Sequence, residues 1–226
     1  MNKDIEIITI DGPACSGKGV IAKKISEILN FNYLDSGSMY RVIAFIANRN
    51  SLFKNTQITH EGINSLLELL NKVNLKFIND SVYIDDENVT NLLRTEIIGN
   101  LASIIGKDYK IREYLLSMQR SFAKSPGLVS DGRDMGSVVF PRAKLKIYLT
   151  ASVDIRVQRR YKQLQKFNKS VKISSVLKFI MDRDKSDIER KISPLVYDDT
   201  FKILDNSFLT IEESVKLILN WYYELS

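Results

Sequence analysis

Residues 5–20 read Ile5-Glu6-Ile7-Ile8-Thr9-Ile10-Asp11-Gly12-Pro13-Ala14-Cys15-Ser16-Gly17-Lys18-Gly19-Val20. The first half is a mostly apolar run rich in β-branched residues, which is typical of a strand buried on both faces of a parallel sheet. The second half is a turn that contains glycines and leads into a helical pattern. A strand, a glycine-bearing turn and a helix in this order predict an α/β protein built outward from this stretch.

The turn from Gly12 to Lys18 matches the first seven positions of the phosphate-loop pattern. Glycines let several backbone N–H groups point at one phosphate, and the following helix adds its positive N-terminus. Lys18 would reach the outer phosphates. The eighth position is Gly19 instead of Ser or Thr, a variant expected of kinases similar to the nucleoside monophosphate kinases. A turn that merely favours glycine is the alternative, which the flanking strand and helix disfavour.

The composition of the 226 residues bounds the class of protein: 44% are hydrophobic and 27% are charged, as in soluble globular proteins. No apolar run approaches the ~18 residues of a membrane span. Met-Asn-Lys-Asp leads directly into the first strand, so we expect no signal peptide. One cysteine excludes an internal disulfide and fits a reducing compartment. We therefore expect a cytoplasmic protein with no membrane partner.

The net charge of +6 fits a nucleic-acid partner, an anionic substrate or a lysine-rich surface. The lysines are scattered, and the sequence has neither a basic tail nor an aromatic stacking platform, so we expect no nucleic-acid partner. The single histidine, His60, lies in a polar stretch and is expected at the surface. This removes histidine-based triads and metal clusters, and leaves Lys, Arg and Asp for catalysis.

Strands and helices alternate along the chain, which predicts one doubly wound parallel sheet of five strands. After the first strand, further strands are predicted at 31–34, 128–130, 145–149 and 201–205. After the phosphate loop, a helix is predicted from Val20 to Asn30. Further helices are predicted from about residue 38 through Ile46, at 152–165, up to about Lys185, across 187–191, and from Thr210 to the end. Thr210 and Glu213 have the spacing of a capping box.

Residues from about 60 to 95 interrupt this pattern and are interpreted as an insertion. An amphipathic helix is predicted at 59–72. The hydrophobic period then changes to two, which predicts antiparallel strands around Leu75 and Phe77 and at 81–85, with Asn79-Asp80 as the turn. Helices are predicted again at about 91–105 and 108–124, the second ending at Ser125-Pro126-Gly127.

Three segments rich in polar side chains each follow a predicted strand: the loop 12–19, the segment 35–41 (Asp-Ser-Gly-Ser-Met-Tyr-Arg) and the segment 131–136 (Asp-Gly-Arg-Asp-Met-Gly). Ligands of open α/β sheets bind at the carboxyl ends of the strands, so these segments are expected to share one crevice. Backbone donors, a lysine, two arginines and several carboxylates suit a site for two phosphorylated molecules.

In their order and spacing, these segments resemble those of the bacterial cytidylate kinases, a branch of the nucleoside monophosphate kinases. Residues 183–195 extend the resemblance, which covers essentially the whole chain. The resemblance implies a P-loop kinase fold, with a five-stranded parallel sheet flanked by helices, an insertion that binds the nucleoside monophosphate (NMP), and a short helical lid. The expected division of this single unit is a core of about 1–37, 100–155 and 173–226, an NMP-binding part of about 38–99 and a lid of about 156–172.

The resemblance also implies an activity in pyrimidine nucleotide metabolism: ATP-dependent phosphorylation of CMP and dCMP to CDP and dCDP by direct in-line transfer. The implied cofactors are ATP and Mg²⁺, with the metal held mainly by ATP oxygens and waters and by no cluster of protein ligands. The implied partners are these small molecules, and a monomer is expected.

Site residues are carried over from the resemblance position by position. The expected catalytic residues are Lys18, Arg41, Arg133, Arg159 and Asp134. The expected ATP contacts are Gly12, Pro13, Ala14, Cys15, Ser16, Gly17, Lys18, Gly19, Val20, Arg156, Arg159 and Arg160. The expected acceptor contacts are Ser36, Arg41, Arg133 and Arg190 for the phosphate, Ser103, Arg112 and Asp134 for the cytosine edge, and Arg183 and Asp187 for the sugar.

The chemistry of these side chains suits those roles. Phosphoryl transfer needs positioning and cations, and the arginine fork binds phosphate bidentately. Arg156, Arg159 and Arg160 share one helical face, which could also be a solvated basic face. Arg133 lies between Asp131 and Asp134, which favours a held, functional arginine. Cytosine presents an amino donor beside two acceptors, which a carboxylate, a hydroxyl and an arginine complement, whereas uracil would set a carbonyl against Asp134.

Three positions depart from the family pattern: Val20 stands where Thr or Ser is usual, Cys15 replaces a small residue, and Ser186 stands where arginine is common. Two alternatives stay open from the residues alone. One is a small phosphate-loop kinase acting on UMP, a deoxynucleotide or a non-nucleotide acid. The other is a basic nucleotide-binding regulator or a nucleic-acid-dependent ATPase.

Overall fold

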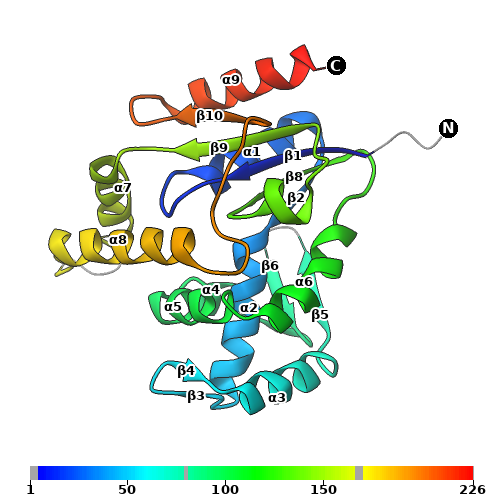
Figure 1. Cartoon of the computed structure of the whole chain (residues 1–226), viewed down its shortest axis with the longest axis vertical. Coiled ribbons are helices and arrows are strands. Elements are labelled where there is room, and N and C mark those ends of the chain that lie inside the picture. Colours follow the sequence, from blue (N-terminus) through cyan, green and yellow to red (C-terminus); the bar gives the residue numbers. More distant parts are fainter. Residues whose placement is uncertain (1–4, 79–80, 166–169, 226) are drawn as a thin grey trace. The chain divides into compact units, whose positions relative to one another are not determined.

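The computed structural model describes residues 5–78, 81–165 and 170–225. The chain forms two compact units (Figure 1). The sheet unit comprises Met1–Ser36 and Gln119–Ser226, and the insertion unit comprises Gly37–Met118. The insertion unit is longer than the NMP-binding part expected at about 38–99. The predicted turn at Asn79-Asp80 and residues 166–169 of the predicted lid lie outside the described residues.

The sheet unit contains a five-stranded sheet in the order β10-β9-β1-β8-β2. Its strands are β1 (Glu6–Asp11), β2 (Asn32–Asp35), β8 (Gly127–Gly132), β9 (Leu145–Thr150) and β10 (Phe201–Asp205). All four pairings are parallel, which confirms the predicted sheet. Asp11 lies opposite both Gly132 and Tyr148, so β1, β8 and β9 end at one edge.

Apolar residues of four strands form the main core together with α1 (Lys18–Leu29) and α9 (Ile211–Glu224). All six residues of β8 are buried, as expected for an inner strand covered on both faces. Full burial of an isoleucine such as Ile8 or Ile10 contributes roughly 1.5–3 kcal/mol. The predicted capping box is present at the start of α9, where Thr210 and Glu213 exchange hydrogen bonds.

Two further helices of the sheet unit, α7 (Val153–Gln165) and α8 (Ile173–Glu189), pack together around Val157, Val176 and Ile180. The prediction of a break near Lys185 was wrong, because α8 runs without interruption to Glu189. No glycine or proline lies between residues 173 and 189, so nothing in that segment forces the helix to end. A π-helical turn, η1 (Met135–Val139), was not predicted.

The insertion unit contains the helices α2 (Ser36–Arg49, entered from the sheet unit), α3 (His60–Leu70), α4 (Thr90–Leu93), α5 (Glu96–Ile105) and most of α6 (Tyr109–Ser121). The predicted single helix over 91–105 is therefore two helices, separated where Thr95 takes an extended conformation. His60 is exposed, as predicted. None of the described helices in either unit has both the length and the apolar character needed to cross a bilayer.

The small strands of the insertion unit are antiparallel. The predicted pairing of β5 (Leu75–Ile78) with β6 (Ser81–Ile84) is confirmed. The structure adds β7 (Glu87–Asn88) beside β6, and a separate pair of β3 (Phe53–Lys54) with β4 (Gln57–Ile58). Two-residue strands show no hydrophobic period, so sequence analysis could not find them.

Candidate active site

The loop from Gly12 to Gly19 joins the central strand β1 to α1, in the position predicted for a phosphate loop. A Cβ at Gly12 would lie 2.0 Å from the carbonyl oxygen of Leu149, so only glycine fits there. Gly17 is the N-cap of α1 with φ +95°, a left-handed conformation that glycine adopts readily. It has no side chain to cap the helix, so the first N–H groups of α1 suit an external anion.

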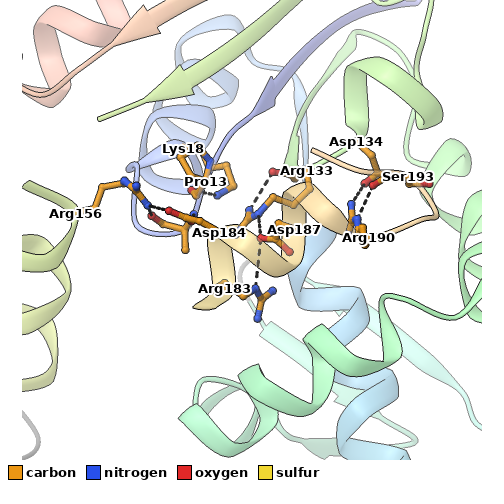
Figure 2. Close-up of polar contacts among 12 residues, drawn as sticks. Pro13, Lys18, Arg133, Asp134, Arg156, Arg183, Asp184, Asp187, Arg190 and Ser193 are labelled. Carbon is orange, nitrogen blue, oxygen red and sulfur yellow. Dashed lines mark hydrogen bonds and ion pairs between the residues drawn. The ribbon is translucent and has the colours of Figure 1, made fainter. Parts of the chain in front are cut away.

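Lys18 is folded back over this loop, where its Nζ donates a hydrogen bond to the carbonyl oxygen of Pro13 at 3.1 Å (Figure 2). The residue is only 8% exposed. Burial and the nearby positive charge of Arg133 lower the pKa of Lys18 to about 8. The negative charges of Asp131 and Asp187 act in the opposite direction and raise it. Lys18 thus remains a cation at neutral pH but lacks hydration, which favours a phosphate as its partner.

Asp131, near the end of β8, places a buried carboxylate beside the phosphate loop. It accepts a hydrogen bond from the Tyr33 hydroxyl at 2.7 Å. Its Oδ2 would lie 3.7 Å from a Cβ at Gly19. Burial and the neighbouring Asp35 raise the pKa of Asp131 to about 7, while Lys18 acts in the opposite direction. The arrangement sets a lysine and a carboxyl group close together at the same loop.

Arg133 and Arg183 converge on Asp187 (Figure 2). Oδ2 of Asp187 lies 2.6 Å from Nε of Arg133 and 3.4 Å from Nε of Arg183. Burial alone would raise the pKa of Asp187, but the two guanidinium groups lower it to about 2. The carboxylate that accepts the hydrogen bond from Nε of Arg133 belongs to Asp187 of α8, far along the chain from the flanking Asp131 and Asp134.

Asp134 and Arg190 form a second buried pair in the same unit (Figure 2), with 3.8 Å between Oδ1 of Asp134 and Nη2 of Arg190. Asp134 is the N-cap of η1, and Arg190 is the C-cap of α8. Nε of Arg190 donates to the carbonyl oxygen of Ser193 at 2.5 Å, which fixes the direction of its guanidinium. Two residues predicted to bind the acceptor are therefore neighbours.

The arginines of α7 contact the phosphate loop from outside it. Arg156 forms an ion pair with Asp184 of α8, with 2.5 Å between Nη1 and Oδ2 (Figure 2). Arg156 also donates a hydrogen bond to the carbonyl oxygen of Ala14, and the N–H of Ala14 donates one to Asp184. Arg159 donates to the carbonyl oxygen of Ser16 at 3.1 Å and to Asn206. These two arginines therefore do not belong to a solvated basic face, the alternative that the sequence left open. Arg160 is half-buried, and its Nη1 contacts Gln163.

The insertion unit gathers its three predicted site residues around α5. Arg41 donates to the carbonyl oxygens of Leu93 and Thr95, and its guanidinium lies only 3.0 Å from where a Cβ would stand on Gly99. Arg112 is buried, donates to the carbonyl oxygen of Gly106 at 2.9 Å and lies over the ring of Tyr40. Ser103, half-buried, belongs to α5 itself.

Ser36 belongs to the sheet unit and is buried at the start of α2, where its hydroxyl accepts a hydrogen bond from Gln119 at 3.0 Å. Three polar residues of the sheet unit were not predicted. Asp184 and Asn206 contact the phosphate loop, and Asp11 contacts the segment after β8. Asp11 could have been noticed, because it ends a buried strand directly before Gly12. Asp184 and Asn206 carry no local signal, since they reach the loop from 170 and 190 residues away along the chain.

Comparisons with known proteins identify the family of this chain. The model of the cytidylate kinase family matches residues 8–224. A cytidylate kinase of Ralstonia nicotianae is 41% identical over 219 residues, which cover 97% of this chain and 93% of that protein. A cytidylate kinase of Nitrosomonas europaea is 41% identical over 222 residues, covering 98% and 97%. A solved structure of an uncharacterized protein from Eubacterium ventriosum shares the fold, with a TM-score of 0.54, 14% identity and coverage of 96% and 98%.

Proposed function

The chain belongs to the cytidylate kinase family and is an enzyme of the nucleoside monophosphate kinase class, and on this premise we propose that it transfers the γ-phosphoryl group of ATP to CMP and dCMP. One observation carries the proposal. The phosphate loop with its buried Lys18 and the segment holding Arg133 and Asp134 follow β1 and β8, which end at the same edge of the sheet. A donor site and an acceptor site can therefore adjoin. We also propose that the enzyme is cytoplasmic and acts as a monomer.

The donor is proposed to bind with its β- and γ-phosphates on the N–H groups of the loop, beside Lys18. An anion there would restore the electrostatic stabilisation that Lys18 loses through burial. The proposed reaction is an in-line displacement: an oxygen of the CMP phosphate forms a bond to the γ-phosphorus, and the bond from that phosphorus to the bridging oxygen of ADP breaks. Lys18 neutralises the charge that develops on the transferred group. Arg156 and Arg159 are proposed to hold the loop and the donor nucleotide, with α7 as part of the lid.

The chemistry of the donor side also fits Mg²⁺. Within the described residues, no three His, Cys, Asp or Glu side chains form a metal-binding group. Mg²⁺ needs fewer protein ligands than such a group provides, because it is usually held by one or two carboxylates together with phosphates and waters. Asp131, beside Lys18 and Gly19, is the carboxylate proposed to hold it. When bound, the metal would neutralise negative charge on the donor phosphates.

The acceptor phosphate is proposed to bind Arg133 and Arg190 of the sheet unit together with Ser36, and the insertion unit is proposed to supply Arg41. Asp134 is proposed to accept the amino group of cytosine, with Ser103 and Arg112 on the same base. Arg183 and Asp187 are proposed to bind the sugar. Arginine suits these contacts because its fork matches two phosphate oxygens and stays charged at all relevant pH values.

The acceptor specificity gives the direct test. In an assay coupled to ADP release, we expect kcat/KM for CMP and dCMP to exceed that for UMP by about 10²-fold or more, because UMP would leave a buried carboxylate facing a carbonyl. Equal turnover of UMP would contradict the cytosine-specific proposal. ATPase activity that rises with DNA or RNA and ignores CMP would favour the nucleic-acid-dependent alternative.

Replacing Asp134 with alanine should separate the two substrates. We expect KM for CMP to rise about 10–100-fold, the effect of losing one buried hydrogen-bond partner, while the dissociation constant for ATP stays within about twofold. Isothermal titration with a non-hydrolysable ATP analogue measures the latter. Asp199→Ala, an exposed carboxylate of the same unit, is the matched control. Equal loss of CMP and ATP binding would show that Asp134 has a structural role.

A further inference from the structure

Asp11, the last residue of β1, is a buried carboxylate that the proposed reaction does not use. It is 0% exposed. Its Oδ1 accepts a hydrogen bond from the N–H of Met135 at 2.9 Å, and its Oδ2 accepts one from the N–H of Gly136 at 2.7 Å. Both donors belong to the first turn of η1. A residue from the central strand therefore caps a helical turn that is 124 residues away along the chain.

The residue that would ordinarily provide this cap is Asp134, the N-cap of η1. An aspartate at this position typically turns its carboxylate back to the N–H groups of the first helical turn. The carboxylate of Asp134 makes no such bond. It lies instead near Arg190, with 3.8 Å between Oδ1 and Nη2. Because Asp11 already satisfies the first two N–H groups of η1, Asp134 does not have to turn back.

We propose that Asp11 is a positioning residue for the acceptor base: it caps η1 in place of Asp134 and so directs the Asp134 carboxylate to the nucleotide. This inference rests on the proposed function, in which Asp134 accepts the amino group of cytosine. Asp11 also directly precedes Gly12. One side chain thus fixes the acceptor-binding segment to the strand that begins the phosphate loop.

The surroundings of Asp11 explain why a carboxylate is needed there. The two oxygens of Asp11 accept hydrogen bonds from two N–H groups at once. An asparagine would accept only one of these bonds and would point its NH₂ donor at the other N–H group. Gly136 is closely packed, because a Cβ there would lie only 2.7 Å from Oγ1 of Thr9. Burial raises the pKa of Asp11 to about 6. The hydrogen bonds from the N–H groups of Gly136 and Met135 lower the pKa, the negative charge of Asp134 raises it, and the positive charge of Lys18 lowers it.

The test is Asp11→Asn in the full chain, measured by ADP release. We expect KM for CMP to rise about tenfold and the preference for CMP over UMP to fall about tenfold, with KM for ATP within twofold of wild type. In an Asp134→Ala background, the same change should alter KM for CMP by less than twofold. Asp198→Asn is the matched control, because Asp198 also accepts from a backbone N–H, that of Thr200, but is exposed.

Additive effects of Asp11→Asn and Asp134→Ala, or an equal rise in KM for ATP, would overturn the inference. If Asp11→Asn does not fold, wild-type enzyme is titrated with cytidine, which carries no titrating phosphate, between pH 7.5 and 5.5. Protonation of Asp11 near pH 6 should weaken binding about threefold in wild type but not in Asp134→Ala, and an equal loss in both would overturn the inference. Wild-type enzyme that does not turn over CMP would contradict the proposed function itself.

Discussion

Replacing Lys18 with methionine should lower kcat for CMP phosphorylation by about 10³-fold or more, the size of effect seen when a cation that stabilises a transferring phosphoryl group is removed. Methionine keeps the length and the apolar stem of lysine, so it fits the buried path that Lys18 follows over the loop to Pro13. What is lost is the charge. Because Lys18 is poorly hydrated, its interaction with a phosphate is screened by little water and is correspondingly strong.

The effect should fall mainly on kcat, since the loop N–H groups that bind the ground-state phosphates do not depend on the lysine charge. Steady-state measurements with saturating ATP and CMP give kcat, and titration with an ATP analogue gives the donor affinity. Lys24→Met is the matched control, because Lys24 lies on the same helix, is 43% exposed in its side chain and pairs with Glu212 at the surface. A fall in kcat of less than tenfold for Lys18→Met would contradict the proposed role.

The sequence predicted this loop well because its conformation is locally determined. Gly12 and Gly17 stand where a close approach and a left-handed conformation require glycine, and the apolar run before them can only be a covered strand. The five parallel strands followed from the same alternation of apolar runs and helical patterns. The polar residues after β1 and β8 could be assigned to one edge of the sheet by topology alone.

The partners of the charged residues could not be predicted in the same way. Arg133 has carboxylates on both sides in sequence, but its hydrogen-bonded partner is Asp187, 54 residues further along. The cap that Asp11 provides to η1 and the contact of Asp184 with Ala14 likewise depend on how β1, β8 and α8 pack. Periodicity identifies which face of an element is buried. It does not identify which polar side chain on another element lies opposite.

Replacing Asp187 with asparagine should lower the free energy of unfolding by about 3–5 kcal/mol, the usual result of removing one partner from a buried ion pair. Asp187 is buried and its Oδ2 meets both Arg133 and Arg183, so the variant leaves two guanidinium groups in the interior against a neutral amide. The loosened Arg133 should also lower kcat/KM for CMP about 10²-fold. Urea unfolding at neutral pH measures the first effect and the coupled assay the second. Asp182→Asn, exposed on the same helix, is the control.

The pH dependence distinguishes an ion pair from a simple hydrogen bond at Asp187. Its pKa is about 2 in the folded chain, below the value of 3.8 for an unperturbed aspartate. A lowered pKa means that the carboxylate stabilises the fold above pH 4, by about 2 kcal/mol, and that this contribution is lost as the pH falls toward 2. The stability difference between wild type and Asp187→Asn should therefore shrink by roughly 1 kcal/mol between pH 6 and pH 3. A difference that stays constant over this range would show that the charge of Asp187 does not hold Arg133 and Arg183 in place.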